Sequence, residues 1–223
     1  MSEPIRIIDI PDLPDIILPE KVDVTDPRYS RNTQGRINDI PIKPGRYHCY
    51  AKRSLEGKVR LDDDNNIHFE DTLPSTDSNI LEILIAHTDV KREDLKHFEN
   101  IGIIEVESMF AGFFPAPFET PFETLQDNDS WREFRDKIRN IDRTRCKRKK
   151  NKYESIKDIP IEDKIDDYIY DIKDEVYASE PVENAFFALC YEIGYYTLEG
   201  IKENDVYIAL RLVFIDNNFL FDD

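Results

Sequence analysis

The sequence predicts an α+β domain, in which one or two helices pack against a mainly antiparallel sheet and an extended N-terminal arm precedes the sheet. Three observations support this fold class. Residues 101–118 form the densest apolar stretch, residues 206–215 form a second apolar run with the length of a long strand, and the first 43 residues contain six prolines. We therefore divide the chain into an arm (1–43) and an α+β domain (44–223).

The arm is predicted to be extended because each proline removes an amide donor and biases the preceding residue away from helix. The same property disfavours central strands. Apolar residues such as Ile7, Ile8 and Ile10 recur too often for a solvated linker. We expect the arm to lie along its own domain or along a partner.

The domain begins with strand patterns. Residues 46–53 alternate between two faces, as a half-buried strand does. Residues 58–61 and 67–69 flank the turn-forming sequence Asp-Asp-Asp-Asn-Asn, which predicts a hairpin. This acidic turn lacks the glycine and the closing glutamate of a calcium-binding loop, so we interpret it as a solvated turn.

The central strands are apolar on both faces. Residues 80–86 are almost continuously apolar, which is typical of a strand that is buried on both sides. Residues 89–100 predict a short connection with one or two helical turns. A strand over residues 101–106 is followed by a break at Ser108 and Met109, and residues 110–114 resume the extended pattern. Gly112, between aromatic residues, indicates a bulge or a close backbone approach.

The clearest helix signal starts at Ser130, which forms a capping box with Glu133 and precedes Trp131, Phe134 and Ile138 at helical spacing. This helix is expected to lie on the sheet. A second amphipathic helix is predicted over residues 161–176. The remaining patterns predict strands over residues 184–192, 194–201 and 205–215.

Several of these segments together resemble an uncharacterised group of small sheet proteins from bacteria, phages and large DNA viruses. In that group a Val-Asp-Ser/Ala-Gly strand leads into Ala-Gly-Phe-Phe, a helix with Trp and Phe follows, and the last strand is apolar. The chain has Glu107 and Met109 where the group has Asp and Gly. The group has no established activity, so the resemblance implies a fold and no function. The matching residues are Val106–Met109, Ala111–Phe114, Trp131, Phe134 and Ile208–Ile215.

Charge and cysteine content restrict the class of protein. The net charge of −17 argues against general nucleic-acid binding, and only residues 143–152 form a basic cluster. Three widely spaced cysteines predict neither a disulfide framework nor a zinc site. No apolar run approaches the ~20 residues that span a bilayer, and no signal-peptide pattern opens the chain. We expect no membrane insertion, no secretion by a cleaved signal, and a location in the cytoplasm or a virion.

Three segments are candidate partner-binding elements: the arm, the basic cluster and the C-terminal tail, which places phenylalanines between acids. A basic run is equally consistent with a solvated surface that needs no partner. We expect the partner to be another protein or a neighbouring subunit. The predicted partner-binding residues are Ile7, Ile8, Ile10, Arg145, Lys147, Arg148, Lys149, Lys150, Phe219 and Phe221.

Signals of enzymatic chemistry are weak. The chain has no glycine-rich phosphate loop, no G-x-S-x-G sequence and no histidine pair at metal-ligand spacing. The best constellation is Glu105 and Glu107 with His87 or Asp89, which could hold a divalent cation or transfer protons. Exposed positions on a strand explain the same glutamates. We predict no catalytic, cofactor-binding or metal-binding residue.

Three hypotheses of function follow. The first is a non-catalytic structural or interaction protein, such as a minor component of a virus particle or another large assembly. The second is an acidic binder of the immunity or inhibitor type that recognises a basic protein through charge. The third is a metal-dependent hydrolase. We favour the first because extended apolar segments occur without enzyme motifs.

Overall fold

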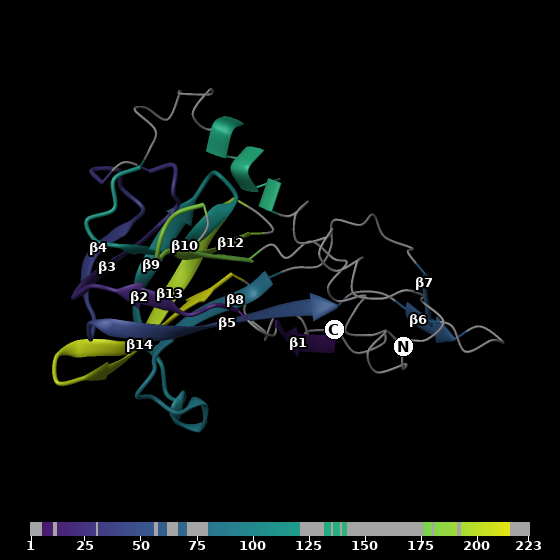
Figure 1. The fold of residues 1–223 in the computed structure, drawn as a ribbon, viewed down its shortest axis with the longest axis horizontal. Coiled ribbons are helices and arrows are strands. Elements are labelled where there is room, and N and C mark those ends of the chain that lie inside the picture. The colour runs from purple at the N-terminus through teal and green to yellow at the C-terminus, as the bar shows by residue number, and fades with distance from the viewer. Residues whose placement is uncertain are drawn as a thin grey trace.

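Two antiparallel sheets, one of seven strands and one of five, face each other in the computed structural model, as Figure 1 shows. Strands of the smaller sheet (β3, β4, β10 and β12) lie above strands of the larger one (β5, β8 and β14). The structure describes residues 6–10, 13–29, 31–55, 58–61, 67–70, 80–120, 132–134, 136–138, 140–141, 176–179, 181–190 and 193–214.

The larger sheet has the order β1-β5-β8-β14-β13-β9, and β2 also pairs with β5. β1 pairs with the last residues of β5, whereas β2 pairs with its first residues. Its strands are β1 (Arg6–Asp9), β2 (Ile16–Leu18), β5 (Gly45–Leu55), β8 (Ile80–His87), β9 (Glu99–Val106), β13 (Gly194–Glu203) and β14 (Val206–Val213).

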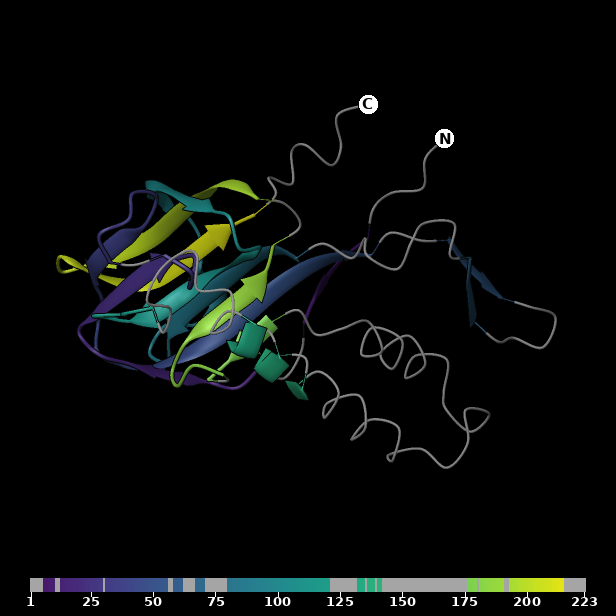
Figure 2. The ribbon, with the colours of Figure 1, turned by 90° about the horizontal axis from the view of Figure 1, so that it is seen from above.

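The smaller sheet has the order β11-β12-β10-β3-β4. Two further strands form a separate hairpin, which Figure 2 draws away from the two sheets. A 3₁₀ turn, η1 (Arg92–Asp94), lies between β8 and β9. The strands are β3 (Lys21–Thr25), β4 (Ile37–Pro41), β10 (Phe110–Pro115), β11 (Val176–Ala178) and β12 (Phe186–Leu189), with β6 (Lys58–Leu61) and β7 (Ile67–Glu70) in the hairpin.

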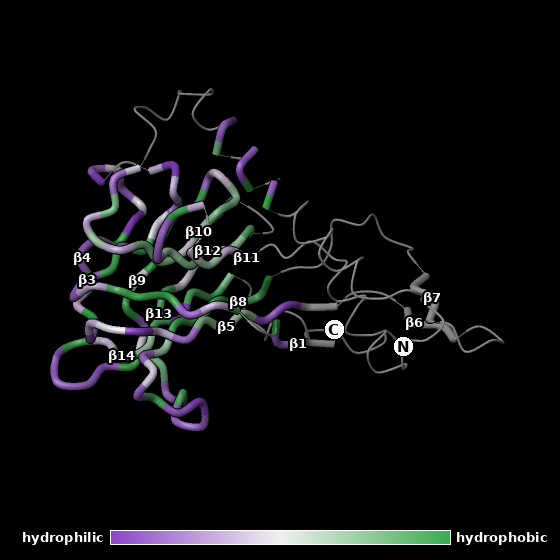
Figure 3. The backbone as a smooth tube through the Cα atoms, viewed as in Figure 1, coloured by the Kyte–Doolittle hydropathy of each residue, from purple (hydrophilic) through white to green (hydrophobic). Residues whose placement is uncertain are grey.

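The main core lies between the two sheets. Alternate side chains of each strand point inward, so Ile83 and Leu210 of the larger sheet share one buried cluster with Phe113 and Phe186 of the smaller sheet. Figure 3 shows apolar residues along the strands and hydrophilic residues in the turns around them. Full burial of each such side chain contributes about 1.5–3 kcal/mol.

A second cluster covers the outer face of the smaller sheet. Helical residues 132–134, 136–138 and 140–141 place Phe134 and Ile138 against Phe110 and Phe187. The rings of Phe110 and Phe134 meet edge to face, with centroids 6.2 Å apart. The predicted helix therefore lies on the sheet, as its spacing indicated.

The architecture is mostly antiparallel sheet with one short helix, which agrees in part with the predicted α+β class. Predicted strands are found in β5, β8, β9, β10, β12, β13 and β14, and the predicted hairpin is formed by β6 and β7. Most of the second predicted helix, at residues 161–176, lies outside the described residues. Its last residue, Val176, begins a strand.

The expectation that proline would keep residues 1–43 out of central strands is wrong for β3. This strand lies between β4 and β10, in the interior of the smaller sheet. The reason is that the prolines flank it: Pro19 precedes Lys21 and Pro27 follows Thr25, so every residue within β3 keeps its amide donor. Residues 16–43 thus supply β2, β3 and β4 to the two sheets.

Gly112 is a close-approach position, as the sequence indicated. A Cβ atom there would lie 2.3 Å from the carbonyl oxygen of Phe186 and 2.3 Å from Cβ of Phe187. Only glycine allows β12 to approach β10 at this distance. Among the described residues, no helix is long and apolar enough to cross a membrane.

Candidate functional site

The predicted acidic constellation does not assemble. His87 ends β8 and Glu105 lies on β9, with β14 and β13 between them, so three strand spacings of ~4.8 Å separate the two strands. The His87 ring packs edge-on against Tyr47, and Glu105 accepts a hydrogen bond of 3.3 Å from the hydroxyl of Tyr195. Among the described residues, no group of three His, Cys, Asp or Glu side chains could hold a metal ion.

The predicted partner-binding residues fall into three groups. Ile10 is buried in the chain's own core, and its amide donates to the carbonyl oxygen of Ala51. Ile7 and Ile8 lie in β1, paired with Ser54 and Arg53. The basic cluster and the aromatic tail lie outside the described residues; these predictions concern Arg145, Lys147, Arg148, Lys149, Lys150, Phe219 and Phe221.

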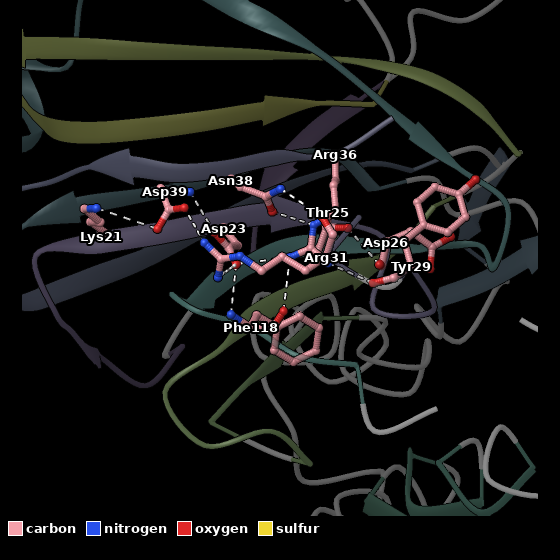
Figure 4. Close-up of polar contacts among 10 residues, drawn as sticks. All are labelled: Lys21, Asp23, Thr25, Asp26, Tyr29, Arg31, Arg36, Asn38, Asp39 and Phe118. Carbon is pink, nitrogen blue, oxygen red and sulfur yellow. Dashed lines mark hydrogen bonds and ion pairs between the residues drawn. The ribbon is translucent and has the colours of Figure 1, made fainter. Parts of the chain in front are cut away.

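The first polar network that the sequence analysis missed surrounds Asp23, a fully buried residue of β3 (Figure 4). Its Oδ2 atom accepts hydrogen bonds from Nη2 of Arg36 at 3.0 Å and from the amide of Phe118 at 2.8 Å. Its Oδ1 atom accepts the amide of Asp39 at 2.8 Å. Arg31 reaches Asp23 at 3.4 Å and also pairs with the Asp39 carboxylate.

The guanidinium of Arg36 is fully buried in this network. Besides Asp23, it donates to the carbonyl oxygens of Tyr29 at 2.8 Å and Phe118 at 3.2 Å. Burial lowers the pKa of Arg36, and the neighbouring charge of Asp23 opposes that shift. The pair therefore fixes the loop between β3 and β4 against the segment after β10.

A second buried acid, Asp26, holds the turn between β9 and β10. Its Oδ2 atom accepts the amides of Glu107 at 2.8 Å and Ser108 at 2.6 Å, and its Oδ1 atom accepts the amide of Arg28 and the hydroxyl of Ser108. Burial raises the pKa of Asp26, while the hydrogen bonds from Ser108, Arg28 and Glu107 act in the opposite direction.

Both networks are structural in their chemistry, because every carboxylate oxygen of Asp23 and Asp26 already accepts donors from the protein. A substrate would have to displace backbone donors to reach them. The only signal in the sequence is an acid between two valines, Val22-Asp23-Val24, with arginines downstream. The valines face the main core, so Asp23 lies on the opposite face of β3, opposite Phe114. The partner of such an acid depends on the tertiary fold, which the sequence pattern does not give.

A histidine–aspartate pair lies beside a cavity of about 330 Å³ at the edge of β5. Nδ1 of His48 is 2.8 Å from Oδ1 of Asp15. The neighbouring Cys49 belongs to the buried core, and burial raises the pKa of its thiol. This thiol is not poised as a nucleophile, because the reactive species is the thiolate.

An exposed apolar surface lies at the opposite edge of the larger sheet. Ile103 of β9 is 59% exposed, Tyr195 of β13 is 74% exposed and Ile193 is 65% exposed. Ile103 is opposite Thr197 and Tyr195 is opposite Glu105, so Ile103 and Tyr195 are diagonal neighbours on the outer face. We call Ile103, Tyr195 and Ile193 the β9 edge surface.

Acids lie along the strand of the β9 edge surface, and Glu105 shares its outer face. Glu99 and Glu107 are exposed, Glu105 is half-buried, and residues 99–107 contain no Lys or Arg. The charge of Glu107 contributes, after burial, to a raised pKa of the nearby Tyr29 hydroxyl. The sequence analysis considered a metal or acid–base role for Glu105 and Glu107, favoured none, and missed the exposed apolar residues beside them. An alternating strand pattern does not reveal which face stays uncovered.

Comparisons of this chain with protein-family models, curated proteins and solved structures gave no match. The resemblance to small sheet proteins of bacteria, phages and large DNA viruses therefore stays a prediction.

Proposed function

We propose that this chain is a non-catalytic interaction protein that binds a neighbouring protein in a larger assembly, such as a virus particle. The observation that carries the proposal is the β9 edge surface. Ile103 and Tyr195 are exposed on the last strand pair of a sheet, and Ile193 is exposed just before β13. Such apolar side chains gain free energy only when another molecule covers them.

The polar chemistry of the described residues supports the same proposal. The two buried carboxylates are occupied by backbone donors and arginines, and the Cys49 thiol is buried beside the His48–Asp15 pair. A general base needs an accessible lone pair within hydrogen-bond reach of a substrate. The buried groups do not offer one, whereas the exposed surface offers contact area.

An alternative is the acidic binder of the immunity or inhibitor type. The three glutamates along β9 and the net charge of −17 favour it. Such a protein would associate with a basic partner at a rate that falls steeply with salt, since charge steers the encounter. A partner association rate that does not change with salt contradicts this alternative.

The experiment uses a photo-crosslinking amino acid in place of Tyr195 in the full chain, expressed in the cells or particles that produce it. The matched control carries the same amino acid in place of Ile17, which is 58% exposed on β2 at the opposite edge of the sheet. We expect irradiation to give one discrete heavier species from position 195 and none from position 17.

The proposal fails if the chain purifies alone from its source and neither position gives a cross-linked product. Equal cross-linking from both positions would show association through other surfaces, and would remove the β9 edge surface as its basis.

A further inference from the structure

Among the described residues, no strand pairs with the outward edge of β9. β9 ends the larger sheet and pairs with β13 alone. The amide of Glu105 donates to the carbonyl oxygen of Gly35 at 2.7 Å, so it points away from β13. Because alternate residues of a strand point their amides the same way, the amide of Ile103 also points outward. Within the described ranges, Ile103 makes no backbone hydrogen bond beyond β13.

The edge at β2 differs, although it carries an equally exposed isoleucine. There the amide of Ile17 donates to the side-chain oxygen of Asn184 at 3.1 Å, which occupies the outward donor. Proteins commonly block their sheet edges in this way. On β9 the contact with Gly35 covers the Glu105 end and the Ile37 side chain lies close to Gly102. At Ile103 itself, the part of the chain that the structure describes contributes no comparable block.

The charges along β9 select the kind of strand that fits. A second copy of β9 would bring the same glutamates and no Lys or Arg, and each copy carries a net charge of −17. Both effects disfavour self-association. A basic strand would instead place Lys or Arg beside the glutamates and its apolar side chains over Ile103 and Tyr195.

We propose that β9 accepts an extended segment of a basic partner protein by strand addition about Ile103, with apolar side chains on the β9 edge surface and flanking Lys or Arg beside Glu105 and Glu107. This inference rests on the proposed interaction function and names its partner class. Main-chain hydrogen bonds supply affinity in this mode, and alternate side chains supply specificity.

The test measures binding of a fluorescent nonapeptide, Lys-Thr-Lys-Thr-Val-Thr-Val-Thr-Lys, to the full chain by anisotropy. Its lysines and valines share one face of an extended strand. Two control peptides carry Glu in place of every Lys, or N-methyl groups on alternate amides. We expect binding of the basic peptide only, with a Kd that rises with salt concentration.

Three variants separate strand addition from simple charge attraction. Ile103→Lys should weaken peptide binding by at least about 10-fold, whereas Ile17→Lys, at an almost equally exposed site, adds the same charge and should leave the Kd unchanged. Ile103→Pro should also abolish binding, because it removes an outward amide without breaking a bond to β13.

Equal weakening by Ile103→Lys and Ile17→Lys overturns the proposal, as does undiminished binding of the N-methylated or the acidic peptide. If Ile103→Pro does not fold, the N-methylated peptide still tests the backbone bonds. Strand addition is also overturned if no binding of the basic peptide is detected at a peptide concentration of about 1 mM. In that case cross-linking from position 195 would still decide the interaction function separately.

Discussion

Replacement of Asp23 by asparagine should destabilise the protein by about 3–5 kcal/mol. The substitution keeps the shape of the side chain but removes the charge that compensates the fully buried guanidinium of Arg36, 3.0 Å away. Loss of one member of a buried ion pair leaves the other without a counter-charge, which costs about this much. The asparagine side chain cannot easily rearrange to reduce this loss, because the amides of Asp39 and Phe118 both need a hydrogen-bond acceptor at this position.

The matched control is Asp39→Asn. Asp39 also pairs with Arg31, but its side chain is 44% exposed, so water can replace the interaction and the stability should scarcely change. Asparagine also tolerates the positive φ of 56° at this position.

Urea unfolding followed by far-ultraviolet circular dichroism measures both variants, with the slope of the transition checked for constancy. A double variant, Asp23→Asn with Arg36→Met, should be less destabilised than the sum of the single variants, since the second change removes the uncompensated charge. A loss below about 1 kcal/mol for Asp23→Asn, or equal losses for Asp23→Asn and Asp39→Asn, refutes the argument from burial.

Three further predictions concern other buried positions. Gly112→Ala should destabilise the fold by about 3 kcal/mol, because its methyl group would meet β12 at 2.3 Å. The control Gly194→Ala, with open space around its Cβ, should be neutral or slightly stabilising. Thermal unfolding compares the two variants, and equal midpoints contradict the reasoning. Burial raises the pKa of Asp26 above that in the unfolded chain, so its contribution to stability is present at low pH and is lost as the pH rises through the folded-state pKa. Urea unfolding of wild type and Asp26→Asn at about pH 3 and pH 7 tests this sign. The free energy of unfolding of wild type, relative to that of the variant, should fall from about pH 3 to pH 7, and a rise contradicts the prediction. Cys49 and Cys190 are buried, and burial raises the pKa of both thiols. In a variant whose third cysteine is replaced by serine, a thiol reagent should therefore react only after unfolding. Rapid reaction of the native variant would exclude the burial of these two thiols.

The periodic spacing of apolar residues in the sequence was sufficient to predict several of the long strands and one helix. The alternation of residues 46–53 and the apolar run of residues 80–86 predicted β5 and β8, and the capping box at Ser130 predicted a helix whose Phe134 packs on the smaller sheet. These signals are local, so the sequence contains them directly.

The two-layer architecture and the polar networks were not predicted, for a physical reason. β2 and β3 are only three and five residues long, and β3 is identified as a strand by its partners β4 and β10 rather than by its own pattern. Asp23 and Arg36 are thirteen positions apart and meet only because the β3–β4 loop returns. Deletion of residues 1–43 would therefore remove strands of both sheets and would test folding rather than partner binding.

The strand order also has a consequence for synthesis of the chain. β14, formed by residues 206–213, lies inside the larger sheet between β8 and β13, and β3 at the other end of the chain needs β10 and β4 on its two sides. A nascent chain on the ribosome cannot complete the larger sheet until its last strand has emerged. Pairings between such distant segments are slow to form, since loop closure costs entropy before the contacts stabilise it. Until residues 206–213 have emerged, β8 can pair with β5 on one side only, and its other side stays an open edge that chaperones would need to protect.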